Sequence, residues 1–288
     1  MAKQVNDDYP GKAPMMSDAQ LKDIATAKYN TNAVDDTLVF DFPTEIVDLP
    51  SKGKLYPQGH PLQKGTIEMK YMTAKEEDIL TNQSFIKNGV VLDKLFKALI
   101  VTPCDYNDLL LCDKNAIMVA ARVLGYGKDY PIKAQSPTTG ETIEHVVDLT
   151  KLKDKEIDWD LIKDGVNEFS LVLPASKLPI KLKLLTQRDQ AKMDAELKGL
   201  AKLKKVAAIS TMMKYIIVDI DGDTDSTKIR KHVDSKLLAI DSRAIRQFLT
   251  KITPEVNLSV EVPDGDSGDT FRTPVNIGLD FFWPDAEL

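Results

Sequence analysis

The second half of this sequence repeats the first, and the repetition constrains the fold more than any other feature. Residues 109–147 match residues 237–275 at a constant spacing of 128 positions, and the matched pairs include Asp113 and Asp241. Two earlier blocks repeat at the shorter spacings of 113 and 117: residues 67–77 with 180–190, and residues 95–101 with 212–218. Because the spacing only grows, the second copy is the longer one. Two copies of one supersecondary unit predict two tandem domains.

Each copy has the pattern of a strand, three helices and a β-hairpin. The segments 67–72 and 180–185 alternate apolar and polar residues, which is typical of strands. The second helix of each copy has apolar residues at helical spacing: Leu92, Leu95, Phe96, Leu99 and Ile100, and then Val206, Ile209, Met213, Ile216 and Ile217. We therefore expect an α+β fold of two tandem, internally duplicated β-α-α-α-β-β units, preceded by an extended N-terminal arm.

Helix starts and turns recur at matching positions of the two copies. Each first strand ends in a threonine with an acid three residues later, the spacing of a capping box. An aspartate in each copy is placed to cap the third helix, and a glycine in each hairpin turn is expected to need a positive φ angle. The predicted caps and turn glycines are Thr73, Thr186, Asp113, Asp241, Gly140 and Gly268.

The repeats define the domain boundaries that we predict. Residues 1–36 carry few large apolar groups and are expected to form a flexible arm. Residues 37–65 begin with a strand at 37–42 and continue as an extended segment, because proline and glycine are too dense for a helix. We expect this lead-in to run over the surface and to offer a partner-docking strap at Leu55, Tyr56 and Pro57. The repeats follow at 66–165 and 166–288.

Composition excludes several classes of protein. The formal net charge of −6 argues against general nucleic-acid binding. The only cysteines, Cys104 and Cys112, rule out a disulfide scaffold and indicate a reducing cytoplasm, where both are expected to act as small apolar residues. No signal peptide and no run of 18 apolar residues is visible, so we expect no membrane association.

No pattern in the sequence indicates catalysis. The acidic segment 219–226 resembles a calcium loop, but its glycine, Gly222, stands at position 4 and Arg230 stands at position 12, where a glutamate is needed. A solvated surface loop is the interpretation that we favour. No histidine stands at metal-ligand spacing with another histidine or a cysteine. We expect no catalytic residue, no metal, no cofactor and no small-molecule ligand, and hence no enzyme; a metal-dependent hydrolase would depend on the acidic loop alone.

A lysine-rich helix is predicted over residues 192–206. Its lysines flank a stripe of Leu197, Leu200 and Leu203, which is typical of a solvated helix face above a core. A second interpretation is that the lysines dock an acidic partner. No aromatic residues are interleaved with the lysines, which argues against nucleic acid at this site.

Three stretches of the first copy resemble a known family: LPSKGKLYP at 49–57, the strand and acidic helix start at 65–80, and the block at 108–130. They are similar to the baseplate hub assembly proteins of T4-type contractile-tailed bacteriophages. The resemblance covers residues 46–150 and reaches the second copy through the internal repeat. Some relatives have cysteine pairs in the hairpin turn, whereas this turn is SPTTG at 136–140, so no metal role is carried over.

The resemblance implies a non-enzymatic phage tail morphogenesis protein. It would bind other baseplate or hub proteins and promote hub assembly in the host cell cytoplasm. The alternative is a permanent structural subunit of the tail baseplate in the mature virion. An extended lead-in and arm suit protein–protein docking, since extended segments add strands to a partner or become ordered on binding.

Overall fold

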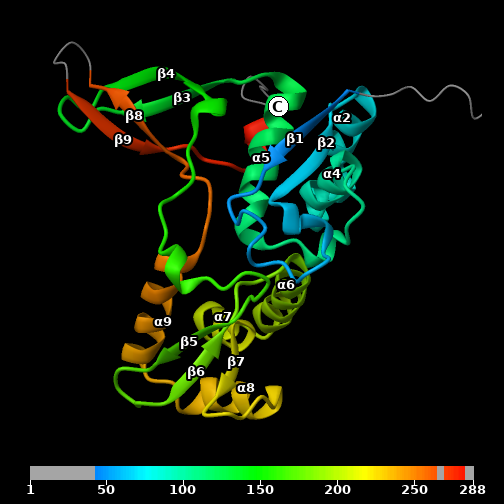
Figure 1. Cartoon of the computed structure of the whole chain (residues 1–288). Coiled ribbons are helices and arrows are strands. Elements are labelled where there is room, and N and C mark those ends of the chain that lie inside the picture. Colours follow the sequence, from blue (N-terminus) through cyan, green and yellow to red (C-terminus); the bar gives the residue numbers. More distant parts are fainter. Residues whose placement is uncertain (1–42, 265–268, 283–288) are drawn as a thin grey trace, which may run out of the picture. The chain divides into compact units, whose positions relative to one another are not determined.

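The computed structural model describes residues 43–264 and 269–282 (Figure 1). The predicted arm at 1–36, the predicted strand at 37–42 and the turn residue Gly268 lie outside the described residues. Within the described ranges, the chain is built of α-helices and small antiparallel sheets. The prediction of an α+β fold is therefore confirmed.

The first half begins with a two-stranded antiparallel sheet and continues with helices. Strand β1 (Thr44–Asp48) pairs with β2 (Thr66–Lys70), with Thr44 opposite Lys70 and Asp48 opposite Thr66. In β2 the alternate residues Ile67 and Met69 are buried, as the alternating pattern predicts. The later elements are α2 (Ala74–Thr81), α3 (Gln83–Asn88), α4 (Val91–Leu99), α5 (Leu111–Tyr126), β3 (Asp129–Gln135) and β4 (Thr142–Asp148).

The second half has a similar order of elements, but it adds β7 and α8 and has a single helix, α6, where the first half has α2 and α3. A three-stranded sheet is formed by β5 (Phe169–Val172), β6 (Pro179–Leu182) and β7 (Ile217–Ile220), with β6 in the centre. The other elements are α6 (Gln187–Lys202), α7 (Ala208–Ile216), α8 (Ser226–Ser235), α9 (Ala239–Ile252), β8 (Ser259–Pro263) and β9 (Thr270–Pro274). Helix α8 was not predicted; it lies where the second copy is longer.

Several contacts recur at the spacings found in the sequence. Met69 forms a bridge with Ile100 in the first half, and Leu182 pairs with Ile217 in the second, at spacings of 113 and 117. These recurrences support a repeated unit. The proposed repeat boundaries at 66–165 and 166–288 stay a prediction, but β1 pairs with β2 and so belongs with the first unit rather than with a separate lead-in.

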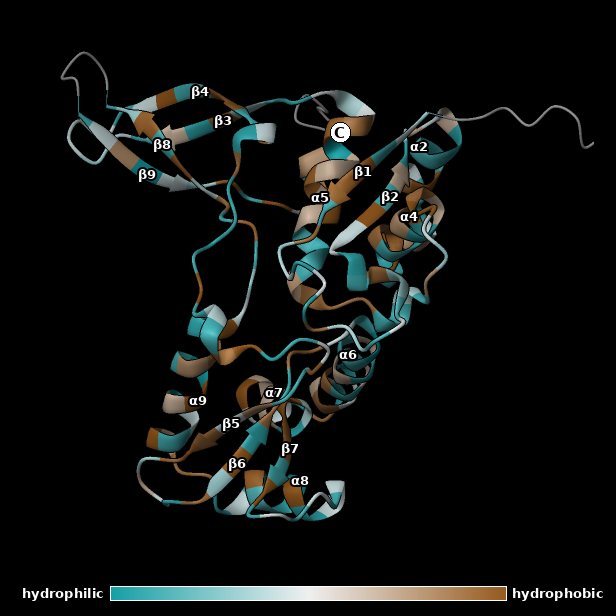
Figure 2. Ribbon diagram, in the orientation of Figure 1, coloured by the Kyte–Doolittle hydropathy of each residue, from teal (hydrophilic) through white to brown (hydrophobic). Residues whose placement is uncertain are grey.

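The core is one continuous cluster that includes residues of both halves. Figure 2 shows apolar residues along α4 and α5, and Val91, Leu95, Phe96 and Leu99 of α4 are buried, close to the predicted stripe. The corresponding prediction for α7 is wrong in part. Val206 and Ile209 are 98 % and 52 % exposed, because α7 begins only at Ala208 and its buried face starts further along.

The last described residues pack against the first half. Phe281 and Phe282 are fully buried, and the Phe281 ring lies 4.8 Å from the ring of Tyr130 in β3. The Arg122 side chain of α5 donates from Nε to the Phe281 carbonyl at 3.0 Å. The two halves therefore do not form separate hydrophobic interiors. Among the described residues, no helix has the length and hydropathy needed to cross a bilayer.

Candidate functional site

The two predicted threonine caps form capping boxes. Thr73 is the N-cap of α2, and its backbone N–H and hydroxyl both donate to the Glu76 carboxylate, at 3.1 and 2.6 Å. Thr186 is the N-cap of α6 and makes the same pair of bonds with Asp189, at 3.1 and 3.0 Å. These residues organise helix starts, so their role is structural.

Each of the two cap acids also binds a lysine, which is the last residue of β2 in the first half and directly follows β6 in the second. Lys70 lies 2.9 Å from Glu76, and Lys183 lies 2.7 Å from Asp189, again at a spacing of 113. Burial raises the pKa of both acids, but the bonds from the threonine and the lysine outweigh it, so both pKa values are lowered. Both acids are therefore ionised at neutral pH and fully committed to these local contacts.

Asp113 is not the N-cap that the sequence predicted. Helix α5 begins at Leu111 with Leu110 as its N-cap, so Asp113 is the third helical residue. Its carboxylate is completely buried and accepts three hydrogen bonds: from the backbone N–H and hydroxyl of Ser51, at 2.9 and 2.7 Å, and from the Tyr56 hydroxyl at 2.9 Å. Asp113 thus holds the loop after β1 against α5 instead of capping its own helix.

Asp241 makes the corresponding contact in the second half. It is the third residue of α9, behind the N-cap Leu238, and it is completely buried. Its carboxylate accepts the backbone N–H groups of Ala175 and Ser176 at 2.8 and 3.1 Å, in the turn after β5. We name this arrangement, one buried aspartate holding the turn after the first strand, the aspartate lock.

The two locks differ in their electrostatics. Burial raises the pKa of Asp113 above its ordinary value, and its three donors only partly offset that effect. At Asp241 burial also raises the pKa, but the N–H groups of Ala175 and Ser176 outweigh it, and the pKa is lowered. Both carboxylates are fixed in place by these hydrogen bonds, so their role is structural.

The predicted docking strap is wrong for two of its three residues. Leu55 and Tyr56 are each 2 % exposed, and only Pro57 is exposed. The Tyr56 hydroxyl donates to Asp113 and accepts the Leu110 N–H at 3.1 Å, so the tyrosine belongs to the aspartate lock. Leu55 and Tyr56 are therefore part of the core rather than of a surface strap. The predicted extended backbone is also wrong in part, because residues 50–55 form turns and Pro61–Lys64 form a short 3-10 helix.

The carboxylates of the acidic segment 219–226 bind backbone N–H groups and a lysine close to them in the sequence. Asp219 accepts the Gly222 N–H at 2.8 Å, and Asp225 is the N-cap of α8. Asp223 forms an ion pair with Lys228 at 2.7 Å. Within the described ranges, no group of three or more histidine, cysteine or acidic side chains could hold a metal ion. The geometry therefore gives no support to a calcium site in this loop.

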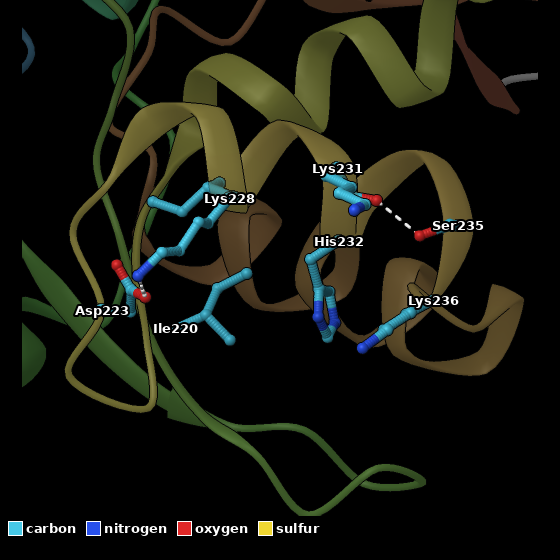
Figure 3. A pocket seen from close by; sticks show the side chains of 8 residues that line it. Ile220, Asp223, Lys228, Lys231, His232, Ser235 and Lys236 are labelled. Atoms are coloured by element: carbon cyan, nitrogen blue, oxygen red, sulfur yellow. Dashed lines mark hydrogen bonds and ion pairs between the residues drawn. The ribbon is translucent and has the colours of Figure 1, made fainter.

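A shallow pocket of about 330 Å³ lies along α8 (Figure 3). Its lining is basic, but Lys228 is neutralised by Asp223. The Ser235 hydroxyl donates to the Lys231 carbonyl at 2.6 Å rather than to the His232 ring. Ser235 therefore lacks the hydrogen-bonded base that an activated hydroxyl nucleophile needs.

Two features of the described surface suit protein binding better than catalysis. The first is the tip between α6 and α7, where Leu203 and Val206 are 68 % and 98 % exposed beside the exposed lysines 202, 204 and 205. Exposed apolar side chains rimmed by charge are typical of protein-interaction sites. We name this surface the α6–α7 tip. The lysines of the lysine-rich helix are exposed, as predicted, but the rest of the prediction is wrong in part. The helix ends at Lys202, and of the expected core stripe Leu197 and Leu200 are only half-buried and Leu203 is exposed.

The second feature is a groove of about 530 Å³ between β1 and α5. Small and medium apolar residues of α5 form one wall, among them Ala116, Ala120 and Val123. The charged residues in the lining are all acidic: Glu45, Asp48 and Asp154. Burial raises the pKa of Asp154, Lys52 lowers it, and the neighbouring Asp48 raises it, with a raised value as the net result. We name this surface the β1–α5 groove.

Other predicted residues have structural roles. Gly140 has a φ of +76° in the β3–β4 turn, as expected. Cys104 and Cys112 are free thiols, half-buried and buried, and burial raises the pKa of both. Sequence reasoning missed the loops that the aspartate locks hold. A signal was present, because Leu49-Pro50 and Leu173-Pro174 repeat at a spacing of 124, and both leucines are buried.

Comparison with known proteins identifies the family. The family model described as T4 bacteriophage base plate protein matches residues 42–272, which include both aspartate locks and both capping boxes. No match was found among the curated proteins or among the solved structures. Since the family model covers well over half of the chain, this protein belongs to the family of T4 bacteriophage base plate proteins.

Proposed function

We propose that this chain is a non-enzymatic tail morphogenesis protein that binds components of the baseplate hub and promotes hub assembly in the cytoplasm of the infected cell. The observation that carries the proposal is the match of residues 42–272 to the baseplate family. It supports contact with other baseplate proteins. The more specific role in hub assembly rests on the resemblance of residues 46–150 to hub assembly proteins.

The surface chemistry is consistent with protein binding. The α6–α7 tip offers Leu203, Val206 and Ile209, which are 68 %, 98 % and 52 % exposed, and the nearby lysines give it a positive rim. A partner with an apolar anchor and acidic neighbours would bury the three apolar side chains and pair with the lysines. The lysines would then dock an acidic partner, which is the second interpretation of the lysine-rich helix, and the three apolar side chains would form the centre of the binding surface.

Infection with phage whose copy of this gene is inactivated tests the role in assembly. The proposal expects tails without complete hubs, and it expects assembly to be restored by the wild-type chain supplied from a plasmid. Quantitative mass spectrometry of purified virions separates the two roles. An assembly factor is absent or far below one copy per hub, whereas stoichiometric retention identifies a permanent structural subunit.

A pair of variants links the role to the α6–α7 tip. Val206→Asp places a carboxylate at the centre of the tip, whereas Val172→Asp makes the same change at a residue of β5 that is 62 % exposed. We expect only Val206→Asp to reduce rescue of hub assembly and co-purification of hub proteins. Equal rescue by both variants would show that the tip is not the binding surface.

A further inference from the structure

The two halves of the chain are joined by a short stretch of backbone pairing. Residues 109–111, which we name the plug segment, lie antiparallel to residues 185–187, the socket segment, and Leu110 and Thr186 form the bridge between them. The last residue of the plug segment, Leu111, is the first residue of α5, the helix that carries the aspartate lock. The last residue of the socket segment, Gln187, is the first residue of α6, the helix with the capping box. The pairing therefore joins two well-fixed helix starts.

Two backbone hydrogen bonds make this link. The Leu111 N–H donates to the Leu185 carbonyl at 2.9 Å, and the Gln187 N–H donates to the Leu109 carbonyl at 2.8 Å. Leu109 and Gln187 are 1 % and 5 % exposed, so the link excludes water. At its edge, Arg188 beside the socket forms ion pairs with two acids that precede the plug, Asp105 and Asp108, at 3.0 and 2.9 Å.

Both segments have a counterpart in the opposite half. Residues 237–239 stand 128 positions after the plug segment and form a second plug at the start of α9. Residues 72–74 stand 113 positions before the socket segment and form a second socket at the start of α2. The chain therefore carries two plugs and two sockets, of which the intrachain link uses one each.

The second plug is exposed at Leu238 and Ala239 and the second socket at Ala74, while their other residues are half-buried. Leu238 and the adjoining Ile240 are 49 % and 66 % exposed, whereas Leu110 and the adjoining Cys112, at the same positions of the first half, are 2 % and 8 % exposed. In the second socket, Ala74 is exposed, whereas its counterpart Gln187 is buried. Apolar side chains that are buried at the first plug thus have exposed counterparts at the second.

The backbone groups of the second pair are also available. In the part of the chain that the structure describes, no hydrogen bond uses the Ala239 or Ala74 N–H, or the Leu237 or Met72 carbonyl. Ala239 and Ala74 are the first residues of their helices, whose N–H groups have no partner within the helix. These four groups correspond to the four that make the two hydrogen bonds of the intrachain link.

We propose that copies of this chain associate head to tail, with the second plug of one copy pairing with the second socket of the next copy by the contact that joins the halves within one chain. The occupant of each exposed segment is a second copy, because the chain itself shows the matching surface already bound to its counterpart. The contact is heterologous, so repeated addition produces a closed ring or an open filament. The proposal does not depend on the baseplate role.

Charge at the edge of the contact makes the association salt-dependent. Lys236 stands 128 positions after Asp108, and Lys75 stands 113 positions before Arg188. The ion pair of the intrachain link is thus replaced by two lysines, both exposed. Because salt screens the repulsion between like charges, association should strengthen as the salt concentration rises. Lys236→Asp restores the arrangement of opposite charges and should strengthen association several-fold.

Proline substitutions test the backbone pairing without disturbing the fold. Ala239→Pro and Ala74→Pro each remove one N–H of the proposed contact at the first position of a helix, where proline is well tolerated. The preceding residues, Leu238 and Thr73, have the extended backbone that proline requires of its neighbour. Ser226→Pro is the matched control, because Ser226 is the first residue of α8 and its preceding residue, Asp225, is also extended.

Sedimentation velocity of the full chain, at increasing concentration in low and high salt, provides the measurement. We expect the wild-type mass to rise above the 32.1 kDa of one chain, most strongly in high salt. Each proline variant should weaken association about tenfold, the value of one hydrogen bond and its adjoining contacts. Ser226→Pro should behave as wild type, and circular dichroism melting should show that all variants are folded.

A mixture of the two proline variants distinguishes this contact from a symmetric dimer. Ala239→Pro keeps an intact socket and Ala74→Pro keeps an intact plug, so the mixture should form heterodimers that do not grow further. A wild-type chain that stays monomeric in high salt overturns the proposal. So does association that either proline variant leaves unchanged. Loss of association would leave the proposed function standing, since that function is tested by hub assembly with variants of the α6–α7 tip.

Discussion

Leu109 and Leu110 of the first half are buried, whereas Leu237 and Leu238 at the same positions of the second half are half-exposed and exposed. The capping boxes and the aspartate locks are alike in the two halves. The difference goes with pairing: the first plug segment pairs with the socket segment of the other half, whereas no backbone pairing involves the second plug in the part of the chain that the structure describes. The contact made by the first plug is the basis on which we propose the second plug as a surface for a partner.

The halves also differ in how the sheet meets the lock-bearing helix. In the first half Glu45, Ala116 and Ala120 line the β1–α5 groove. In the second half Phe169, which stands 124 positions after Glu45, is 4 % exposed, and Phe248 stands 128 positions after Ala120. Larger side chains thus occupy positions that border an open groove in the first half. The first half therefore has an open groove at positions where larger side chains pack in the second half.

The largest expected effects are in the shared core. Ile117 and Ile245 stand at the same helical position of α5 and α9, and both are fully buried. Ile117→Ala and Ile245→Ala should each lower the free energy of unfolding by about 2–5 kcal/mol, through lost burial and an unfilled cavity. Urea denaturation measures this. A cost below about 1 kcal/mol at only one of the two sites would break the equivalence of the halves.

The aspartate locks should differ in strength. Asp113→Ala leaves the Ser51 and Tyr56 donors buried without an acceptor, and should cost about 2–4 kcal/mol at neutral pH. Asp241→Ala frees two N–H groups of a part-buried turn and should cost about 1–2 kcal/mol. Denaturation of both variants checks the order. A larger cost at Asp241 than at Asp113 would contradict the assignment of the stronger lock to the first half.

The two capping boxes should contribute equally to stability, and each should contribute less than the Asp113 lock. Thr73→Ala and Thr186→Ala should each cost about 0.5–2 kcal/mol, because each removes the hydroxyl of an N-cap whose acid partner is retained. Serine at either position keeps the hydroxyl and serves as the control. Thermal melting of the four variants gives the comparison, and a cost that serine does not recover would point to packing rather than capping.

At acid pH, the contributions of Asp113 and Asp241 to the free energy of unfolding should change with pH in opposite directions. The pKa of Asp241 is lowered in the fold, so its contribution is fully present above its ordinary value of 3.8 and is lost as the pH falls through the lowered pKa. The pKa of Asp113 is raised, so ionisation opposes folding as the pH rises above 3.8 through the raised pKa.

Urea denaturation of Asp113→Asn and Asp241→Asn at several acid pH values tests this difference. The stability advantage of wild type over Asp241→Asn should grow with pH, and its advantage over Asp113→Asn should shrink. If the stability differences of the two variants changed with pH in the same way, the two buried carboxylates would have similar pKa values. That result would contradict the opposite pKa shifts of Asp113 and Asp241.

The α6–α7 tip should have the smallest effect on folding. Val206→Asp should change the free energy of unfolding by less than about 0.5 kcal/mol, because the side chain is 98 % exposed. Thermal melting checks this, and it separates a loss of partner binding from a loss of stability. A large destabilisation would mean that the tip packs against the rest of the chain.

The elements predicted correctly depend on local patterns. Alternation identified β2, and the threonine–acid spacing identified the capping boxes of α2 and α6, since both signals lie within a few neighbouring residues. The predictions for Asp113 and Tyr56 failed because the partners of these residues are distant in the sequence. Tyr56 lies in a proline-rich segment that resembles a surface loop, and only its bond to Asp113 of α5 brings it into the core.

The candidate surfaces were the least predictable features. Val206 continues an apolar helical stripe in the sequence, but the helix begins two residues later and leaves it exposed. Leu238 is exposed whereas its counterpart Leu110 pairs with Thr186 and is buried, and the apolar periodicity of the sequence is the same for both residues. Internal repetition was nevertheless sufficient to indicate which residues to compare once the fold was described.

Amide hydrogen exchange at the two turns tests most directly whether both halves are held by the same lock. The N–H groups of Ser51, Ala175 and Ser176 all donate to a buried aspartate, so all three should exchange slowly. Asp113→Asn should accelerate exchange at Ser51 alone, and Asp241→Asn at Ala175 and Ser176 alone. Rapid exchange at either turn of the wild-type chain would contradict a common unit held in the same way in both halves.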